Sequence, residues 1–226
     1  MKKNIEYTDE SWNAISGCIP TDCAVKEHIS KCWAEKMADR LKGRYGYDIK
    51  NPFKPTFHKD QINKPLHWKK PRRVVCCFMG DIAYAEYDWI KQVLDIIKKT
   101  PQHRYYILTK KPSALLQYKF PNNTWVGVTI NRKKDLYRFE DLLHIHSMVK
   151  YISFEPIYES LDLLEEKYEM INDKFWIIIG AQTNPEFQPE KKWVDNIVNF
   201  ARINNIPVFM KDNLRYEPKT YNFPKI

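Results

Sequence analysis

Three cysteines lie close together near the start of the sequence, at Cys18, Cys23 and Cys32. Three thiolates can hold a 4Fe–4S cluster by three of its irons and leave the fourth iron open. An open iron can bind the amino and carboxylate groups of S-adenosylmethionine, and electron transfer to the sulfonium then yields a 5′-deoxyadenosyl radical. The spacing therefore makes these three side chains candidate ligands of an iron–sulfur cluster.

Zinc is an alternative, because His28 lies inside the same segment. Cys18, Cys23, His28 and Cys32 would make a closed tetrahedral set, and the spacing does not exclude it. Free thiols in a loop are a third reading of the same residues. The odd total of five cysteines argues against a framework of disulfides.

The other two cysteines, Cys76 and Cys77, are adjacent within an apolar run. Neighbours in a strand point to opposite faces, so we expect at most one of them to face any site. Small buried core residues are the expected role of this pair.

Short apolar runs alternate with helical patterns along the chain. The runs are nearly continuous in Val, Ile, Phe and Tyr, which is typical of parallel strands covered on both faces. They predict an α/β fold, an incomplete (β/α) barrel of six to seven parallel strands. The expected strands span residues 11–16, 73–79, 104–109, 124–130, 150–154, 175–180 and 207–210, and the expected helices 32–44, 87–99, 135–146 and 191–204.

Ligands of βα barrels bind at the carboxyl ends of the strands. Polar or glycine residues follow several of the expected strands, and solvated loop polars are the alternative explanation. The candidate cofactor-binding residues are Met79, Gly80, Asp81, Thr109, Lys110, Glu155 and Gln182.

Residues 42–73 lack periodicity and carry most of the net charge of +9, with ten Lys or Arg against two Asp. We expect an irregular insertion within one domain spanning residues 1–226. Basic charge interleaved with aromatics is typical of nucleic-acid surfaces, so DNA or RNA is a candidate partner. This segment is expected to bind a nucleic-acid backbone beside the cluster rim. The expected phosphate contacts are Lys69, Lys70, Arg72 and Arg73; a solvated basic face is the alternative.

No stretch approaches the ~18 apolar residues that a membrane span needs. The first residues lack the apolar run of a secretory signal, so a cytoplasmic protein is expected. No P-loop, zincin or α/β-hydrolase motif occurs in the sequence.

Ten motifs in order resemble the phage Gp37/Gp68 family, also called the DUF5131 or three-Cys-motif family. They include WNAISGC (12–18), CWAEKMADRLKGRYGYD (32–48), FMGDIAY (78–84), PQHRYYILTKKP (101–112), YISFEPI (151–157), WIIIGAQT (176–183) and PVFMKD (207–212). The resemblance covers residues 12–212 and implies a partial barrel, similar to that of radical-SAM proteins, with a cluster loop after the first strand. It also implies that the turn of Met79, Gly80 and Asp81 holds the methionine amine.

Several positions depart from the family pattern, among them Trp33 in place of the usual tyrosine and Asp212-Asn213 in place of Gln-Trp. The middle cysteine has a different spacing, and Gln182 stands where the family has a glutamate. The resemblance implies an architecture and names no reaction. Two classes of function therefore stay open: a radical-SAM-type enzyme, with nucleic acid as a candidate substrate, or a non-catalytic iron–sulfur or zinc protein that binds nucleic acid or a partner protein.

Overall fold

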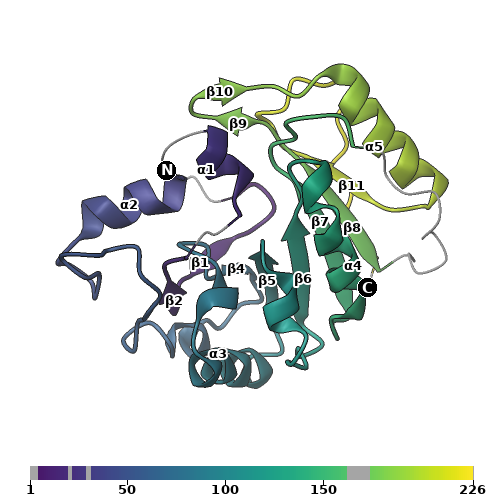
Figure 1. Cartoon of the computed structure of the whole chain (residues 1–226). Helices are drawn as coiled ribbons and strands as arrows, with labels where there is room; N and C mark the ends of the chain where they lie inside the picture. Colours follow the sequence, from purple (N-terminus) through teal and green to yellow (C-terminus); the bar gives the residue numbers. More distant parts are fainter. Residues whose placement is uncertain (1–4, 20–21, 29–31, 162–173, 226) are drawn as a thin grey trace.

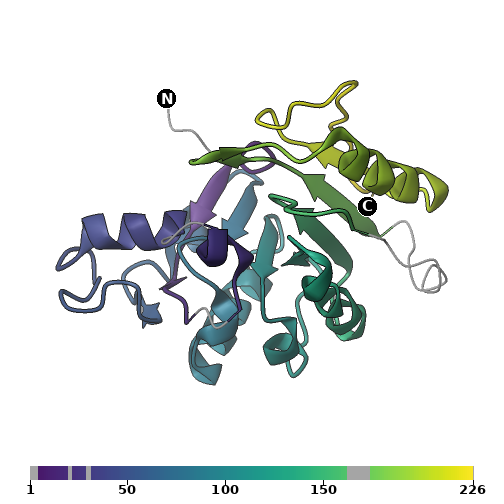
Figure 2. The same cartoon turned by 45° about the horizontal axis from the view of Figure 1, so that its top comes forward.

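Seven parallel strands form the main sheet of the protein. The computed structural model describes residues 5–19, 22–28, 32–161 and 174–225. The strand order is β1-β4-β5-β6-β7-β8-β11, and Figures 1 and 2 show the sheet curled into an open half-barrel. This confirms the predicted incomplete barrel. The strands are β1 (Glu10–Trp12), β4 (Arg73–Cys76), β5 (Arg104–Thr109), β6 (Thr124–Thr129), β7 (Val149–Phe154), β8 (Phe175–Ile179) and β11 (Val208–Met210).

Helices connect successive strands and cover the outside of the sheet (Figure 1). They are α3 (Tyr87–Lys99), α4 (Tyr137–His144) and α5 (Lys191–Ile203). In α3 the buried residues Ile90, Val93, Leu94 and Ile97 recur at helical spacing and form the apolar stripe that packs on the sheet. The shorter connections contain the 3₁₀ turns η2 (Ile82–Tyr84), η3 (Pro112–Leu115) and η4 (Lys133–Asp135).

Both faces of the sheet are buried, which explains the continuous apolar strands. Tyr105 belongs to the larger core cluster, while its neighbour Tyr106 belongs to a second, mostly aromatic cluster with Trp125, Tyr151 and Trp176. The two clusters lie on opposite faces because successive side chains of a strand alternate.

The segment before the first cysteine is two strands rather than the single strand expected at residues 11–16. β1 joins the main sheet beside β4, whereas β2 (Ile15–Ser16) pairs antiparallel with β3 (Thr56–Phe57). Between residues 42 and 72 the only regular elements are β3 and the 3₁₀ turn η1 (Lys64–His67), and Arg73 already begins β4, so the expected insertion is irregular up to residue 72.

The remaining elements are α1 (Ala24–His28), α2 (Trp33–Leu41) and the hairpin of β9 (Gln182–Thr183) with β10 (Glu186–Phe187). Within the described ranges, no helix has both the length and the apolar character that crossing a bilayer requires.

Candidate functional site

A pocket of about 350 Å³ opens at the carboxyl ends of the strands. Much of its polar wall comes from residues that end or follow the strands, as the sequence predicted for a barrel, and Asp22 and Lys26 add to it from the cysteine-bearing segment. All five cysteines also line this pocket. The polar residues from the strand ends are Gly80, Asp81, Thr109, Lys110, Thr129, Ser153, Glu155 and Lys211.

Cys18, Cys23 and Cys32 are partly exposed and face this common space. Burial raises the pKa of the Cys18 thiol to about 12, and the Asp81 carboxylate adds to the effect. Burial also raises the pKa of Cys32, whose sulfur accepts a hydrogen bond from the Glu35 amide at 3.3 Å and caps α2. A thiolate at these positions therefore needs a positive group beside it.

The three sulfurs line one pocket without meeting at a point. Among the residues that the structure describes, no three His, Cys, Asp or Glu side chains converge closely enough to hold one metal ion. The thiolates of a 4Fe–4S cluster bind separate irons, so they surround a volume rather than a point. His28, the fourth ligand of the zinc alternative, does not line the pocket and stacks on Tyr158 with ring centroids 3.7 Å apart.

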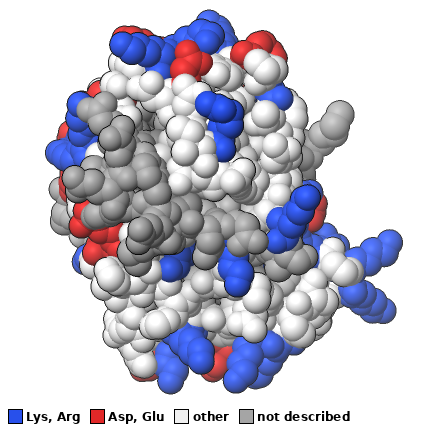
Figure 3. Space-filling model, turned by 90° about the vertical axis from the view of Figure 1, so that its right-hand side faces the viewer, with Lys and Arg blue, Asp and Glu red and all other residues white. Residues whose placement is uncertain are grey.

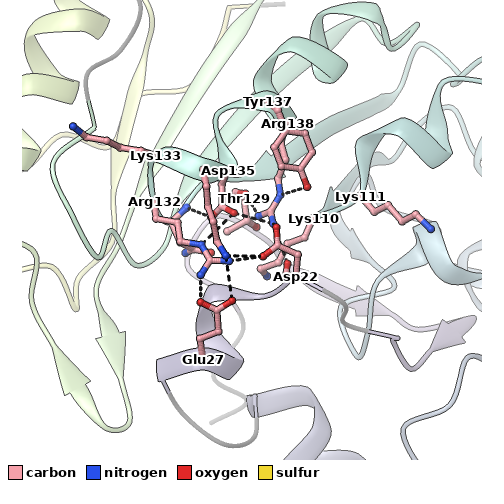
Figure 4. Close-up of polar contacts among 12 residues, drawn as sticks. Asp22, Glu27, Lys110, Lys111, Thr129, Arg132, Lys133, Asp135, Tyr137 and Arg138 are labelled. Carbon is pink, nitrogen blue, oxygen red and sulfur yellow. Dashed lines mark hydrogen bonds and ion pairs between the residues drawn. The ribbon is translucent and has the colours of Figure 1, made fainter.

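A network of charges, fully buried at Arg138 and Asp135 and partly solvated at Asp22 and Glu27, holds the segment around Cys23 (Figure 4). The fully buried Arg138 side chain donates hydrogen bonds to the backbone carbonyls of Thr129 and Asp22 at 2.9 and 3.0 Å. It also lies 3.0 Å from the buried Asp135 carboxylate. Arg132 pairs with Asp22 at 2.5 Å and with Glu27 of α1. The connection after β6 thus fixes the cysteine-bearing segment.

Asp81 braces the ends of two strands. Its carboxylate accepts hydrogen bonds from the Thr109 hydroxyl and the Lys110 amide, both at 2.8 Å, and from the Ala83 amide at 3.1 Å. These three residues, with the acid itself, connect the end of β4 to the end of β5. The Asp81 carboxylate lines the pocket, as predicted. Its hydrogen-bond partners among the described residues are other groups of the protein chain.

A glycine is needed at position 80 because the backbone of Gly17 packs directly against it, and not because a ligand needs space there. It pairs with Gly17 as an isolated bridge, and a Cβ at Gly80 would lie 2.1 Å from the Gly17 carbonyl oxygen. Met79 packs its side chain into a small cluster with Ala34 and Phe53, next to two of the cysteines, and is not among the residues lining the pocket.

Glu155 and Lys211 form an ion pair at 2.8 Å on the pocket wall. The Glu155 carboxylate raises the pKa of Lys211 above its usual value. Gly180 makes room for the pair, because a Cβ there would lie 2.9 Å from the Lys211 side chain and 3.0 Å from that of Glu155. Tyr7 also lines the pocket, and burial together with Glu155 raises its pKa.

The expectation that only one of Cys76 and Cys77 faces a site is wrong. Both line the pocket, with sulfurs 3.7 Å apart. β4 ends at Cys76, and Cys77 has a positive φ of 58°, which breaks the alternation of an extended strand. Their burial, in contrast, is as expected.

Gln182 lies outside the pocket lining, in the β9–β10 hairpin. Its side chain accepts a hydrogen bond from the Tyr158 hydroxyl at 2.5 Å and donates one to the Pro185 carbonyl at 2.7 Å. The structure therefore does not bring this predicted site residue together with the others.

The expected phosphate contacts lie at the other end of the sheet. Arg73 begins β4, whereas the cysteine pocket lies beyond its last residue, so the expected position beside the cluster rim is wrong for Lys69, Lys70, Arg72 and Arg73. Arg72 pairs with Glu10 at 2.7 Å and Arg73 with Asp9 at 3.0 Å, while the two lysines are exposed.

Sequence reasoning missed two aromatic residues at the pocket. Trp33 and Phe78 are 51% and 36% exposed, their ring centroids are 4.8 Å apart, and both line the cavity. A search of the sequence for charged clusters or metal-ligand spacings does not find these two residues. Their exposure depends on how α2 packs beside the turn after β4.

A family model described as "Protein of unknown function (DUF5131)" matches residues 2–223. The chain belongs to the DUF5131 family. No curated protein matches this DUF5131 chain.

One similar solved structure is a spore photoproduct lyase mutant with bound AdoMet and dinucleoside spore photoproduct. The TM-score is 0.51 at 12% sequence identity, and the match covers 74% of this chain. The DUF5131 chain matches only 55% of the length of that structure. At this identity the likeness shows the fold alone, a half-barrel like that of radical-SAM proteins.

Proposed function

We propose that the chain is an iron–sulfur enzyme of the radical-SAM type. The observation that carries the proposal is that Cys18, Cys23 and Cys32 all face one pocket at the carboxyl end of a radical-SAM-like half-barrel. When bound, the cluster and S-adenosylmethionine would supply one-electron radical chemistry. Free cysteines suit a reducing cytoplasm, which we propose as the location.

The chain's own residues would shape and shield the site. The three cysteines would hold the cluster, and the Lys110 side chain partly offsets the rise that burial causes in the pKa of the neighbouring Cys18. Asp81 keeps the turn after β4 fixed through its three hydrogen bonds. We propose that Gly80, Asp81, Thr109, Lys110 and Glu155 border the S-adenosylmethionine site, since all five line the pocket; Met79 and Gln182 would act only from outside it.

Nucleic acid is the proposed substrate class. The excess of basic residues in 42–73 supports it, as does the exposed aromatic pair of Trp33 and Phe78, on which a base could stack. The dinucleoside bound in the similar structure is consistent with this choice.

A second candidate is a non-catalytic cluster or zinc protein that binds nucleic acid or a partner protein. It is favoured by the commitment of the three pocket acids to internal contacts: Asp81 to the β5 end, Glu155 to Lys211 and Asp22 to Arg132. Such acids are less available for proton transfer to a substrate.

Anaerobic reconstitution with iron and sulfide tests the cluster. We expect about four irons and four sulfides per chain, lost in Cys18→Ser and Cys32→Ser. The matched control is Cys76→Ala, a pocket cysteine outside the ligand set, which should retain the cluster. One tightly bound zinc without sulfide, released by His28→Ala, would establish the zinc alternative instead.

Reduction in the presence of S-adenosylmethionine tests the enzyme. We expect 5′-deoxyadenosine from the reconstituted protein and none from Cys18→Ser. A protein that holds its cluster but forms no 5′-deoxyadenosine, with or without DNA or RNA, would belong to the second candidate class.

A further inference from the structure

A second cavity of about 340 Å³ lies at the amino ends of β4, β5 and β6, at the opposite edge of the sheet from the cysteines. We call it the arginine pocket, because Arg72, Arg73 and Arg104 all line it. Its volume is within the range of small-molecule sites. Neither the cysteine motif nor the proposed radical chemistry accounts for it.

The cations of the arginine pocket are not fully neutralised. Arg73 is held by Asp9, which also lines the cavity, and Arg72 is held by Glu10. Among the described residues, no Asp or Glu forms an ion pair with Arg104. Its guanidinium lies 4.6 Å from the centroid of the Trp125 ring, a cation–π contact that orients the group.

Two further nitrogens of lining residues lack partners. The Nε of Arg72 and the Nδ1 of His103 are buried and, within the described part of the chain, make no hydrogen bond. His103 is itself only 1% exposed. The Arg72 Nε always carries a hydrogen, so a bound group that offers oxygen atoms would be stabilised beside it. The His103 ring donates from its Nε2 to the Pro65 carbonyl at 3.3 Å, which leaves its Nδ1 as an acceptor.

We propose that the arginine pocket binds a phosphate group, carried by a free nucleotide or by a nucleic-acid backbone. Guanidinium groups match phosphate oxygens in pairs and remain charged at all physiological pH values. Arg104 is the arginine of this pocket that forms no ion pair with a described residue. At about 340 Å³, the cavity has room for a nucleoside beside the phosphate. The site does not depend on the cluster or on the radical-SAM proposal.

Calorimetric titration with inorganic phosphate, adenosine monophosphate and a short oligothymidylate tests this site. Arg104→Gln should weaken binding of all three by about tenfold to a hundredfold, since a charge-assisted hydrogen bond is lost. Arg104→Lys, which keeps the charge but not the planar fork, should show an intermediate loss. The matched control is Arg202→Gln, an exposed arginine of α5, which should bind as the unsubstituted protein does.

The source of the phosphate is decided by comparing ligands. Tighter, salt-dependent binding of the oligothymidylate indicates a nucleic-acid backbone, and equal or tighter binding of the mononucleotide indicates a free nucleotide. The proposal is overturned if no ligand binds saturably, or if Arg104→Gln and Arg202→Gln weaken binding equally. Loss of binding in Cys18→Ser would also overturn it, by placing the anion in the cysteine pocket; a failed cluster assay would leave it untouched.

Discussion

Gly17 and Gly80 lie where the cysteine-bearing segment crosses the turn after β4. Their backbones exchange hydrogen bonds, from the Gly17 amide to the Met79 carbonyl at 3.0 Å and from the Asp81 amide to the Gly17 carbonyl at 3.1 Å. A side chain at either glycine would meet backbone atoms, which cannot move aside as a flexible side chain can. The crossing thus fixes Cys18 relative to Asp81.

Gly80→Ala should lower the free energy of unfolding by about 1–3 kcal/mol, the usual cost of overpacking. Gly180→Ala is the matched control, because its nearest contact is the Lys211 side chain rather than backbone. We expect a smaller loss there. Urea unfolding of both variants measures the difference. Equal losses of unfolding free energy would show that the backbone contact between Gly17 and Gly80 is no more rigid than the side-chain contact at Gly180.

Lys211→Met should lower the free energy of unfolding by about 1–3 kcal/mol, because it leaves the half-buried Glu155 carboxylate without its cation. Adding Glu155→Gln should recover part of this loss. Glu155 raises the pKa of Lys211, so the contribution is complete below the ordinary lysine value of 10.5 and is lost as the pH rises through the higher folded value. Urea unfolding at several pH values checks this; a difference that shrinks at neutral pH would contradict it.

The elements that carry Cys23 depend on a contact between distant parts of the chain. Asp22 and Glu27 flank this cysteine, while Arg132 and Arg138 come after β6. The network joins α1 to the barrel through two guanidinium groups (Figure 4). Positioning of the middle cysteine is therefore a tertiary effect.

Arg138→Met should destabilise the protein by about 3 kcal/mol, because it removes the nearer of the two guanidinium groups beside the fully buried Asp135 carboxylate and leaves only Arg132, 3.5 Å away. Arg132→Gln is the contrasting variant, with a loss of about 1 kcal/mol, since its partners Asp22 and Glu27 are partly solvated and the buried Asp135 keeps its closer partner Arg138. Hydrogen exchange of the α1 amides should quicken most in Arg138→Met. Similar exchange in both variants would show that α1 does not depend on the buried pair.

Periodicity predicted the elements that pack on the sheet. The expected helix 87–99 and strand 104–109 have the bounds of α3 and β5. In both, the spacing of apolar residues along the sequence indicates which side chains are buried against the rest of the fold. The strand expected at 11–16 is divided, because β2 pairs with β3 of the insertion, a partner some 40 residues away.

The candidate site was predictable only in outline. Strand-end positions identified Asp81, Thr109 and Glu155 as pocket residues. The arginine network was not visible, because its partners are far apart in sequence and look like solvated charges. Cys77 was misjudged because its left-handed backbone conformation is not encoded by its own residue type.

Over the whole molecule, chemistry is divided between the two edges of one sheet. The cysteines occupy the carboxyl edge and the arginine pocket the amino edge. β5 alone runs from Arg104 to Thr109, about 17 Å at the usual rise of a strand. On the face shown in Figure 3, Lys and Arg form separate groups, so the net charge of +9 is not gathered there into a single patch.

This division changes the expected salt dependence of nucleic-acid binding. Arg72 and Arg73 are already engaged by carboxylates of β1 and the residue before it, so phosphate contacts would have to break those ion pairs. Lys69, Lys70 and Arg104 form no ion pair with any described residue. Three phosphate contacts predict that log K falls with log salt at a slope of about −2.7 on duplex DNA, and less steeply on single strands.

Fluorescence anisotropy of labelled DNA at several salt concentrations measures that slope. Changing Lys69 and Lys70 to Ser together with Arg104→Gln should remove most of the binding and flatten the slope. The free energy of unfolding should fall by only about 1 kcal/mol, because Arg104 loses its cation–π contact with Trp125. Changing Arg72 and Arg73 to Ser should instead lower the free energy of unfolding, because Asp9 and Glu10 lose their partners. A slope steeper than about −4, abolished only by the second pair of substitutions, would show that the two arginines leave their carboxylates for DNA.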